Sequence, residues 1–380
     1  MPMTKLSIEI HGTGIHNRGA ELMAIAVAEK VAARYPDAQI IVPPEFGSAR
    51  DLERYGFICT WEAAGRYGWV RTILNMIRWL PRPYVVNPAQ TDVVLDASGF
   101  AFSDQWGGAP AKNLYRKMQR FYRRRQLLVL LPQALGPFDE TNVALWCKRL
   151  FSRASLICAR DSQSKHFAAP LAAESALRQY PDFTIGIAPL LPADVELPPS
   201  FAAIVPNMRM LDKSHEGELY IRFLRRAADR INDRGGNPIF VIHDAKEDRQ
   251  VIQLMGEDYK GIRVLTHSDP RVLKGILGRA DFVIGSRFHA LVSSLSQGVP
   301  CIGAGWSHKY PELFADFQCP ELLIADLQRL EALDHAIETL TTAQLRTQLS
   351  EKISTAATAL KARVDVMWQE VFALVDRHTR

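Results

Sequence analysis

Residues 281–291, with the sequence DFVIGSRFHAL, contain the pattern on which the fold prediction rests. The apolar first half is typical of a buried strand, and Gly285 and Ser286 mark its end. We expect a helix to follow at once, with Arg287 and His289 in its first turn. Backbone N–H groups and the positive end of the helix dipole attract an anion there, and an arginine adds a forked partner for phosphate or carboxylate. The stretch therefore predicts a phosphate site in which His289 donates a proton or binds phosphate, although an isolated histidine is more often structural.

The same alternation of short apolar runs and helical segments extends in both directions from this stretch. Helical patterns at residues 22–31 and 141–151 lie between runs that read as strands. Such an order favours parallel, doubly wound sheets. The predicted strands are 6–10, 40–42, 93–95, 127–131 and 156–158 in the first half, and 202–205, 238–242, 262–265, 282–284 and 299–302 in the second.

Length and proline content predict two domains. A chain of 380 residues exceeds what one hydrophobic core usually supports, and the proline-rich stretch 185–199 interrupts the alternation. The fold class is therefore α/β, with two Rossmann-like domains that each contain a parallel sheet. We place them at residues 1–188 and 200–340. Residues 341–380 show helical periodicity, and we expect these C-terminal helices to pack back on the first domain.

Composition excludes several classes of protein. Hydrophobic residues make up 47% of the chain and charged residues 23%, which is a globular balance. No run approaches the roughly 18 apolar residues of a spanning helix, and the first residues show no signal-peptide pattern, so we expect a cytoplasmic protein. The five cysteines show no C-x-x-C spacing and the ten histidines no H-x-x-x-H spacing. Neither a metal nor another cofactor is therefore predicted.

Two segments raise the question of a membrane surface. The formal net charge of +5 is modest, and no nucleic acid partner is expected. Basic residues are nevertheless concentrated in residues 112–125. Such a run is usually a solvated helix face; the alternative is contact with an anionic substrate or with the inner face of the membrane. Residues 69–80 likewise suit an ordinary amphipathic helix, with an interfacial helix as the alternative. The basic residues are Lys112, Arg116, Lys117, Arg120, Arg123, Arg124 and Arg125.

The glycine-rich stretch at residues 11–21, HGTGIHNRGAE, follows the first predicted strand and opens a helix. This context suits an anion or a sugar. The stretch departs from the dinucleotide fingerprint because Asn17 stands where the third glycine belongs, and from the Walker pattern because Ala20 and Glu21 follow Gly19. NAD and ATP roles are therefore disfavoured, and tight strand-to-helix packing is the simpler alternative.

Other polar turns also follow predicted strands. In the first domain these are residues 96–100 and 132–138, and in the second they are Arg209 and residues 307–309. Open α/β sheets bind ligands at the carboxyl ends of their strands, so these turns are candidates for substrate contact. The alternatives are ordinary loops and surface charges.

In their order along the chain, these motifs resemble the polysaccharide pyruvyl transferase family. The resemblance implies a fold similar to the two-domain GT-B glycosyltransferases, and it implies transfer of a pyruvyl group from phosphoenolpyruvate to a glycan or lipid-linked sugar. The second turn is less glycine-rich than in many relatives, so the acceptor is not identified. The matching pieces are residues 12–21, 96–99, 133–138, 159–164, 181–182, 207–209, 286–291 and 307–310.

The resemblance also implies roles for individual residues. His289 and Arg287 are expected to be catalytic, and the first domain is expected to hold the acceptor. Alternatives are a GT-B glycosyltransferase or nucleotide-sugar epimerase on the same architecture, or a non-catalytic glycan-binding protein. The expected donor-binding residues are Asn207, Arg209, Ser286, Arg287, His308 and Lys309, and the expected acceptor-binding residues are Asn17, Arg18, Glu21 and Gln133.

Overall fold

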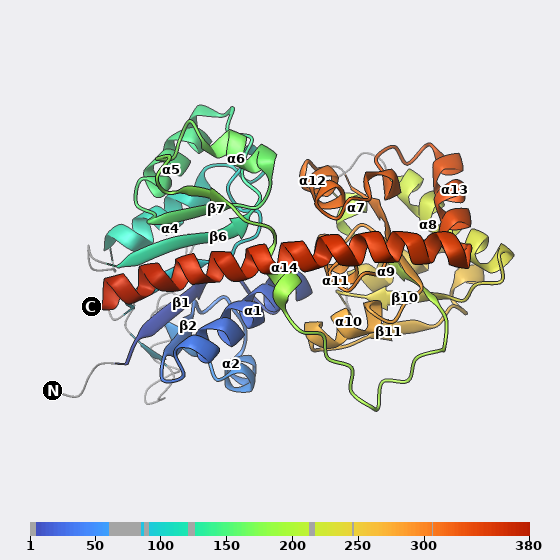
Figure 1. Ribbon diagram of the computed structural model, residues 1–380, viewed down its shortest axis with the longest axis horizontal. Coiled ribbons are helices and arrows are strands. Elements are labelled where there is room, and N and C mark those ends of the chain that lie inside the picture. Colours follow the sequence, from blue (N-terminus) through green and yellow to red (C-terminus); the bar gives the residue numbers. More distant parts are fainter. Residues whose placement is uncertain are drawn as a thin grey trace. The chain divides into compact units, whose positions relative to one another are not determined.

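The computed structural model describes residues 5–60, 85–86, 91–120, 126–212, 217–244, 247–305 and 307–380. The chain divides into two compact units (Figure 1). Unit 1 comprises Met1–His16, Ala20–Phe183 and Arg363–Arg380. Unit 2 comprises Asn17–Gly19 and Thr184–Ala362.

In the described part of unit 1, eight parallel strands form one sheet in the order β4-β3-β2-β1-β5-β6-β7-β8. The neighbouring strands β5, β6 and β7 are largely apolar and buried along their whole length, as expected of parallel strands that are covered on both faces. The strands are β1 Ser7–His11, β2 Gln39–Val42, β3 Ile58–Thr60, β4 Val85–Val86, β5 Val93–Asp96, β6 Leu127–Gln133, β7 Leu156–Ala159 and β8 Leu177–Gln179.

Helices cover this sheet. α4 and α5 pack on the strands β5, β6 and β7 through a buried cluster that includes Leu114, Leu130 and Leu150. α2 starts at a capping box in which Ser48 and Asp51 satisfy each other's backbone N–H groups. The described helices of unit 1 are α1 Arg18–Arg34, α2 Ala49–Tyr55, α4 Ala109–Arg120, α5 Thr141–Phe151 and α6 Ser162–Ala168, with a short 3₁₀ turn at η2 Asp104–Trp106. A further 3₁₀ turn, η3 Phe183–Gly186, begins at the last residue of unit 1 and continues in unit 2.

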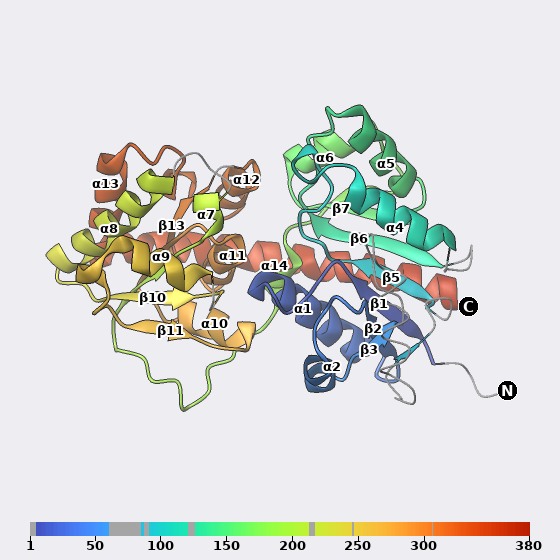
Figure 2. The ribbon, with the colours of Figure 1, turned by 180° about the vertical axis from the view of Figure 1, so that it is seen from behind.

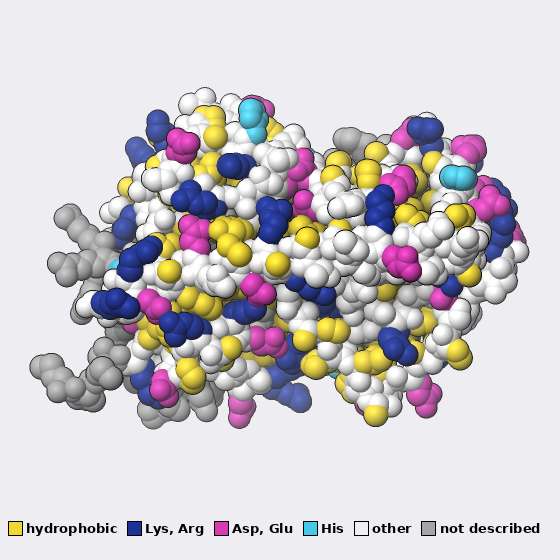
Figure 3. All heavy atoms as spheres, viewed as in Figure 1, with side chains coloured by type: hydrophobic (Ala, Val, Ile, Leu, Met, Phe, Trp, Pro, Cys, Tyr) yellow, Lys and Arg dark blue, Asp and Glu magenta, His cyan; other side chains and the backbone are white. Residues whose placement is uncertain are grey.

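The last helix, α14 (Ala343–Thr379), begins in unit 2 and ends in unit 1. Within unit 1, the ring of Phe372 lies edge-on to that of Tyr35, which directly follows α1, at 5.5 Å, and Tyr180 donates a hydrogen bond to Glu370. The face in Figure 3 shows basic and acidic side chains interspersed, and pairs such as Lys30–Asp365 join α1 to α14. The expectation that the C-terminal helical region packs back on the first domain is confirmed.

Unit 2 contains a second parallel sheet, whose described strands follow the order β11-β10-β9-β12-β13-β14. α8 and α13 lie side by side, joined by the forked pair of Arg226 and Asp334 (Figure 2). The strands are β9 Ala202–Val205, β10 Pro238–Ile242, β11 Val264–Thr266, β12 Phe282–Gly285, β13 Cys301–Ala304 and β14 Leu323–Ile324. The helices are α7 Arg209–Asp212, α8 Gly217–Asp233, α9 Asp248–Met255, α10 Pro270–Leu277, α11 Phe288–Leu295, α12 Lys309–Asp316 and α13 Leu330–Thr341, with 3₁₀ turns η4 Glu257–Tyr259 and η5 Pro320–Leu322.

The predicted class, two parallel-sheet α/β domains, is confirmed. Every predicted strand is present, and β9 and β10 begin and end as expected. β11 and β13 begin two residues later than expected, and the short strands β3, β4, β8 and β14 were not predicted. The stretch 185–199, predicted to be an interdomain linker, contains no strand and no helix beyond the end of η3, and it belongs to unit 2.

The two segments that suggested a membrane surface are only partly within the described residues. Residues 69–80 lie outside them, as do residues 121–125 of the basic stretch. In α4, Lys112 and Arg116 lie over the ring of Trp146 at 5.2 and 5.6 Å. Within the described ranges no helix is both long and apolar enough to cross a membrane. Membrane contact stays a prediction.

Candidate functional site

The predicted donor-binding residues follow three neighbouring strands of unit 2. Because β9, β12 and β13 are parallel, their carboxyl ends meet at one edge of the sheet, together with that of β10. We call this the carboxyl edge of unit 2. It contains, in the order of the strands, His243 and Asp244 after β10, Asn207 and Arg209 after β9, Ser286, Arg287 and His289 after β12, and His308 and Lys309 after β13.

Ser286 connects several elements of this edge through hydrogen bonds. Its carbonyl oxygen accepts hydrogen bonds from Asn207 Nδ2 at 3.1 Å and from Tyr310 Oη at 2.8 Å. Its hydroxyl lies 2.7 Å from Oη of the buried Tyr220, which also accepts from the backbone N–H of Asn207. Burial raises the pKa of Tyr220 above its ordinary value, so the phenol stays protonated. The hydrogen bond between Asn207 and Ser286 connects the end of β9 to the end of β12. A role of these two residues in donor binding stays a prediction.

Arg287 is oriented by a buried carboxylate. Its Nε lies 3.0 Å from Oδ2 of Asp248, and its Nη2 bonds Oδ1 of the same carboxylate. Asp248, the first residue of α9, also accepts from the backbone N–H groups of Met208 and Asp244 at 3.0 Å each. The Arg287 side chain is 16% exposed and that of Asp248 is fully buried. Because Asp248 occupies one side of the guanidinium, a bound anion would meet the remaining N–H groups.

The start of α11 differs slightly from the expected position. β12 ends at Gly285, Arg287 is the N-cap residue, and the helix begins at Phe288. His289 thus lies in the first turn, as predicted, and its Nε2 atom is buried. A Cβ atom at Gly19 would lie 2.3 Å from Nδ1 of His289, so this position has no room for a side chain. Asn17 and Arg18, predicted to bind the acceptor in the first domain, belong to unit 2, whereas Glu21 belongs to unit 1.

His243 is a further candidate that sequence reasoning missed. It follows β10, keeps only 9% of its surface exposed, and has no partner for Nε2 within the described ranges. Burial, together with the positive charges of Arg287, His289 and Arg18, lowers the pKa of His243 to about 3. The imidazole is therefore neutral near pH 7. A buried polar atom of this kind is one that a bound ligand can satisfy.

The remaining predicted residues lie toward the rim of the carboxyl edge of unit 2. Arg209 is 46% exposed and pairs with Glu247 at 3.0 Å. Nζ of Lys309 lies 5.3 Å from the ring centre of Phe288 and 5.4 Å from that of Tyr310, within cation–π range. His308 is the residue that precedes α12. All three residues lie at this edge. Their contact with a donor stays a prediction.

Unit 1 has a corresponding edge after β1, β5 and β6, which we call the carboxyl edge of unit 1. Asp96 is fully buried there, and its carboxylate lies 2.8 Å from Nδ1 of His11. It also accepts from Ser98 Oγ at 2.9 Å and from Gln133 Nε2 at 3.0 Å. The predicted acceptor residue Gln133 is therefore part of a buried network. Glu21, another, is 1% exposed and accepts a hydrogen bond from Tyr55.

Sequence reasoning missed His11, His243 and Asp248 as functional candidates. His11 and His243 each stand at the last or next residue of a correctly predicted strand, a signal that was available. Asp248 was not distinguishable, because nothing local marks an acidic residue at a helix start as the partner of an arginine 39 residues away. Among the described residues, no group of three or more His, Cys, Asp or Glu side chains is placed to hold a metal ion.

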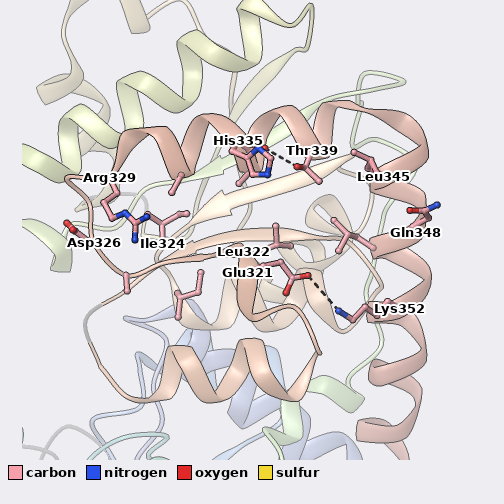
Figure 4. A pocket seen from close by; sticks show the side chains of 15 residues that line it. Glu321, Leu322, Ile324, Asp326, Arg329, His335, Thr339, Leu345, Gln348 and Lys352 are labelled. Carbon is pink, nitrogen blue, oxygen red and sulfur yellow. Dashed lines mark hydrogen bonds and ion pairs between the residues drawn. The ribbon is translucent and has the colours of Figure 1, made fainter.

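A hollow of about 640 Å³ lies elsewhere in unit 2 (Figure 4). It is bounded by β14, α13 and the start of α14, and Lys352 lies 3.7 Å from Glu321 across it. None of the predicted donor-binding residues lines this hollow. We therefore do not assign it to the candidate site.

Several solved structures are similar to this chain in fold. HepE from Anabaena, in complex with UDP-glucose, is 12% identical, with a TM-score of 0.60 over 98% of this chain and 100% of that one. MnaA from S. aureus, in complex with UDP, is 13% identical, with a TM-score of 0.61 over 98% and 97%. UDP-GlcNAc 2-epimerase from Methanocaldococcus jannaschii is 12% identical, with a TM-score of 0.55 over 90% and 94%. At such identities the likeness is one of fold, and it confirms the GT-B-like architecture.

The family of the chain is identified by comparison of its sequence with models of protein families. No curated protein matches the chain significantly. The model of the family described as polysaccharide pyruvyl transferase matches residues 17–308, which is well over half of the chain. The matched region includes Asn207, Arg209, Arg287 and His289. The chain therefore belongs to the polysaccharide pyruvyl transferase family.

Proposed function

We propose that the protein transfers the pyruvyl group of phosphoenolpyruvate to a sugar of a cell-surface polysaccharide or of its precursor. The product is a cyclic pyruvate ketal, and inorganic phosphate is released. The observation that carries the proposal is the placement of Arg287 and His289 at the start of α11 in a chain of this family. An anion-binding helix start and a titratable imidazole are what this reaction needs at its donor.

The charges at the carboxyl edge of unit 2 fit such a donor. Phosphoenolpyruvate has a phosphate and a carboxylate, and Arg18, Arg287 and His289 are the charges that act on His243 there. The N–H groups of Arg287 that do not face Asp248, and the first backbone N–H groups of α11, are suited to these two anionic groups. Neutral His243 adds a hydrogen bond without adding charge.

The proposed reaction has three steps. His289 protonates the methylene carbon of the donor, which makes the neighbouring carbon electrophilic. A sugar hydroxyl attacks this carbon, phosphate leaves, and a second hydroxyl closes the ketal. Positioned acid catalysis contributes about 10²- to 10⁴-fold, so orientation of the donor by Arg287 must supply much of the rest.

The test is to incubate the purified protein with phosphoenolpyruvate and with glycans of its host. We expect phosphate release that depends on both, and mass spectrometry should detect a ketal on the glycan. We expect the same rate with a chelator present, since we propose no metal. Turnover of a nucleotide sugar without phosphoenolpyruvate would instead identify a glycosyltransferase or an epimerase, and binding without any turnover would identify a glycan-binding protein.

A further inference from the structure

The helices α4 and α5, which lie side by side on the sheet of unit 1, contain charged residues of one sign (Figure 2). Neither helix contains an aspartate or a glutamate. A solvated helix face usually mixes both signs, so this surface differs from an ordinary one. Its basic residues are Lys112, Arg116, Lys117 and Arg120 in α4, and Lys148 and Arg149 in α5.

Three of these cations lie around the ring of Trp146 in α5. Nζ of Lys112 is 5.2 Å from the ring centre, and the guanidinium carbons of Arg116 and Arg149 are 5.6 and 4.8 Å from it. Within the residues that the structure describes, none of the three forms an ion pair. Lys117 differs, since its Nζ lies 2.6 Å from Oε1 of the buried Glu9. The charge around Trp146 is therefore available to a partner.

The ring of Trp146 is held in place from within unit 1. It packs against Tyr115 of α4, with 6.1 Å between ring centres, and against the buried cluster below. A Cβ atom at Gly108 would lie 3.2 Å from Cδ1 of the indole, so the chain before α4 also approaches the ring closely. Leu145, the preceding residue, is 45% exposed. We call Lys112, Arg116, Leu145, Trp146 and Arg149 the α4–α5 patch.

The charges between α1 and α14 are arranged differently. Lys30 lies 2.9 Å from Asp365, and Arg34 lies 2.7 Å from Asp376. A cation that is paired in this way attracts an external anion only weakly, because the neighbouring carboxylate offsets its field. In the α4–α5 patch the like charges repel each other, and bound anions would relieve this repulsion. The patch is therefore suited to an anionic partner.

We propose that the protein binds the surface of an anionic phospholipid membrane through the α4–α5 patch. The lipid phosphates would pair with the three cations, the indole would lie at the level of the headgroups, and Leu145 would reach the boundary of the acyl chains. A nucleic acid or a dissolved anionic polysaccharide would also attract the cations, but neither offers an apolar phase to the leucine. Membrane binding is independent of the pyruvyl transfer proposed above, because it needs neither donor nor acceptor.

Co-sedimentation of the full chain with vesicles tests the cations. The parent should bind vesicles of equal parts phosphatidylcholine and phosphatidylglycerol, and it should not bind vesicles of phosphatidylcholine alone. Each Lys or Arg near such a surface contributes about fivefold to binding, so the loss of three should weaken it by on the order of a hundredfold. The variant for this test combines Lys112→Gln, Arg116→Gln and Arg149→Gln.

A control variant removes the same net charge at exposed basic residues elsewhere in unit 1. It should bind anionic vesicles within a few fold of the parent, because a surface at the α4–α5 patch is screened from charges that lie more than about 10 Å away. Thermal unfolding shows whether both triple variants are folded. The control combines Arg50→Gln, Lys165→Gln and Arg377→Gln.

A fluorophore at the position of Leu145 tests the apolar contact without removing any charge. All five cysteines of the chain are buried, so an environment-sensitive dye can be attached selectively to the variant Leu145→Cys. Its emission should shift to the blue on anionic vesicles. The same dye on Ala33→Cys, at an exposed position of α1, should keep its emission.

Several outcomes would overturn the proposal. These are equal binding of the parent to both kinds of vesicle, an equal loss of binding in the two triple variants, and unchanged emission of the dye at Leu145→Cys. If the triple variant of the patch does not fold, the dye decides. A parent that binds heparin or duplex DNA through the patch, but no vesicle, would show that the partner is a dissolved polyanion and that the membrane assignment is wrong.

Discussion

At the carboxyl edge of unit 1 a buried aspartate, Asp96, holds an imidazole, whereas at that of unit 2 a buried aspartate, Asp248, holds a guanidinium. Within the residues that the structure describes, each carboxylate takes part in four hydrogen bonds. Those of Asp96 come from His11, Ser98 and Gln133. Those of Asp248 come from Arg287 and from two backbone N–H groups. Both edges thus contain a buried aspartate that holds a basic side chain, and the kind of basic side chain differs between them.

The difference between the partners determines what each edge can do. An imidazole exchanges a proton near neutral pH, whereas a guanidinium remains a cation at any pH that the fold tolerates. The edge of unit 2 thus contains a permanent cation beside its aspartate, whereas the edge of unit 1 contains an imidazole. A buried aspartate is common to both edges and does not by itself indicate the chemistry.

The largest effect is expected for a substitution of His289, which tests whether the edge of unit 2 also supplies a proton. His289→Gln keeps a hydrogen-bonding side chain but cannot act as an acid, so kcat should fall by about 10²- to 10⁴-fold while donor affinity changes by only a few fold. Steady-state rates and calorimetry measure the two quantities. His335→Gln, at an exposed position of α13, is the matched control. If His289→Gln turns over at the parent rate, the proton comes from another group and His289 is a phosphate ligand or a structural residue.

The next largest effect is expected for substitutions of Arg287, which test whether this residue binds the anionic donor at the edge of unit 2. Arg287→Ala should weaken phosphoenolpyruvate binding by about tenfold to a hundredfold, because a hydrogen bond to a charged group is worth about 1.5 to 3 kcal/mol. It should also lower the melting temperature, since the buried carboxylate of Asp248 loses its cation. Arg287→Lys keeps the charge without the fork and should rescue both properties in part.

Donor titration and thermal unfolding measure these two consequences separately. Arg279→Ala, at an exposed arginine, is the control and should change neither. A donor affinity within a few fold of the parent in folded Arg287→Ala would show that Arg287 serves only to neutralise Asp248. The comparison of the two edges would then fail for unit 2.

The smallest effect concerns His243, the neutral imidazole at the edge of unit 2. The unfolded chain protonates this residue near pH 6.5, but the folded protein does so only near pH 3, because burial and nearby cations lower its pKa. Between these values the unfolded state binds more protons, so the free energy of unfolding falls as the pH falls, by on the order of 1 kcal/mol per pH unit.

Urea unfolding at several pH values between 7 and 4 measures this dependence. His243→Gln should flatten it, whereas His378→Gln, at the exposed end of α14, should leave it unchanged. An unchanged pH dependence in His243→Gln would mean that the pKa of His243 is the same in the folded and the unfolded protein, which would contradict the lowering of this pKa by burial and nearby cations.

The sequence by itself determined the architecture and the edges on which chemistry can occur. Buried parallel strands are continuous apolar runs, so β9 and β10 were predicted with their observed ends. The order of strands and helices then placed Arg287 and His289 at a carboxyl end. The two-residue strands β4 and β14 were missed because so short a run contains no periodicity to recognise.

Only the tertiary structure decided which side chains meet. Asp248 is 39 residues from Arg287, and Asp96 is 85 residues from His11, so neither pair leaves a local pattern in the sequence. The order and register of the strands in each sheet bring the residues together. The same holds for the low pKa of His243, since its causes are burial and charges contributed by distant parts of the chain.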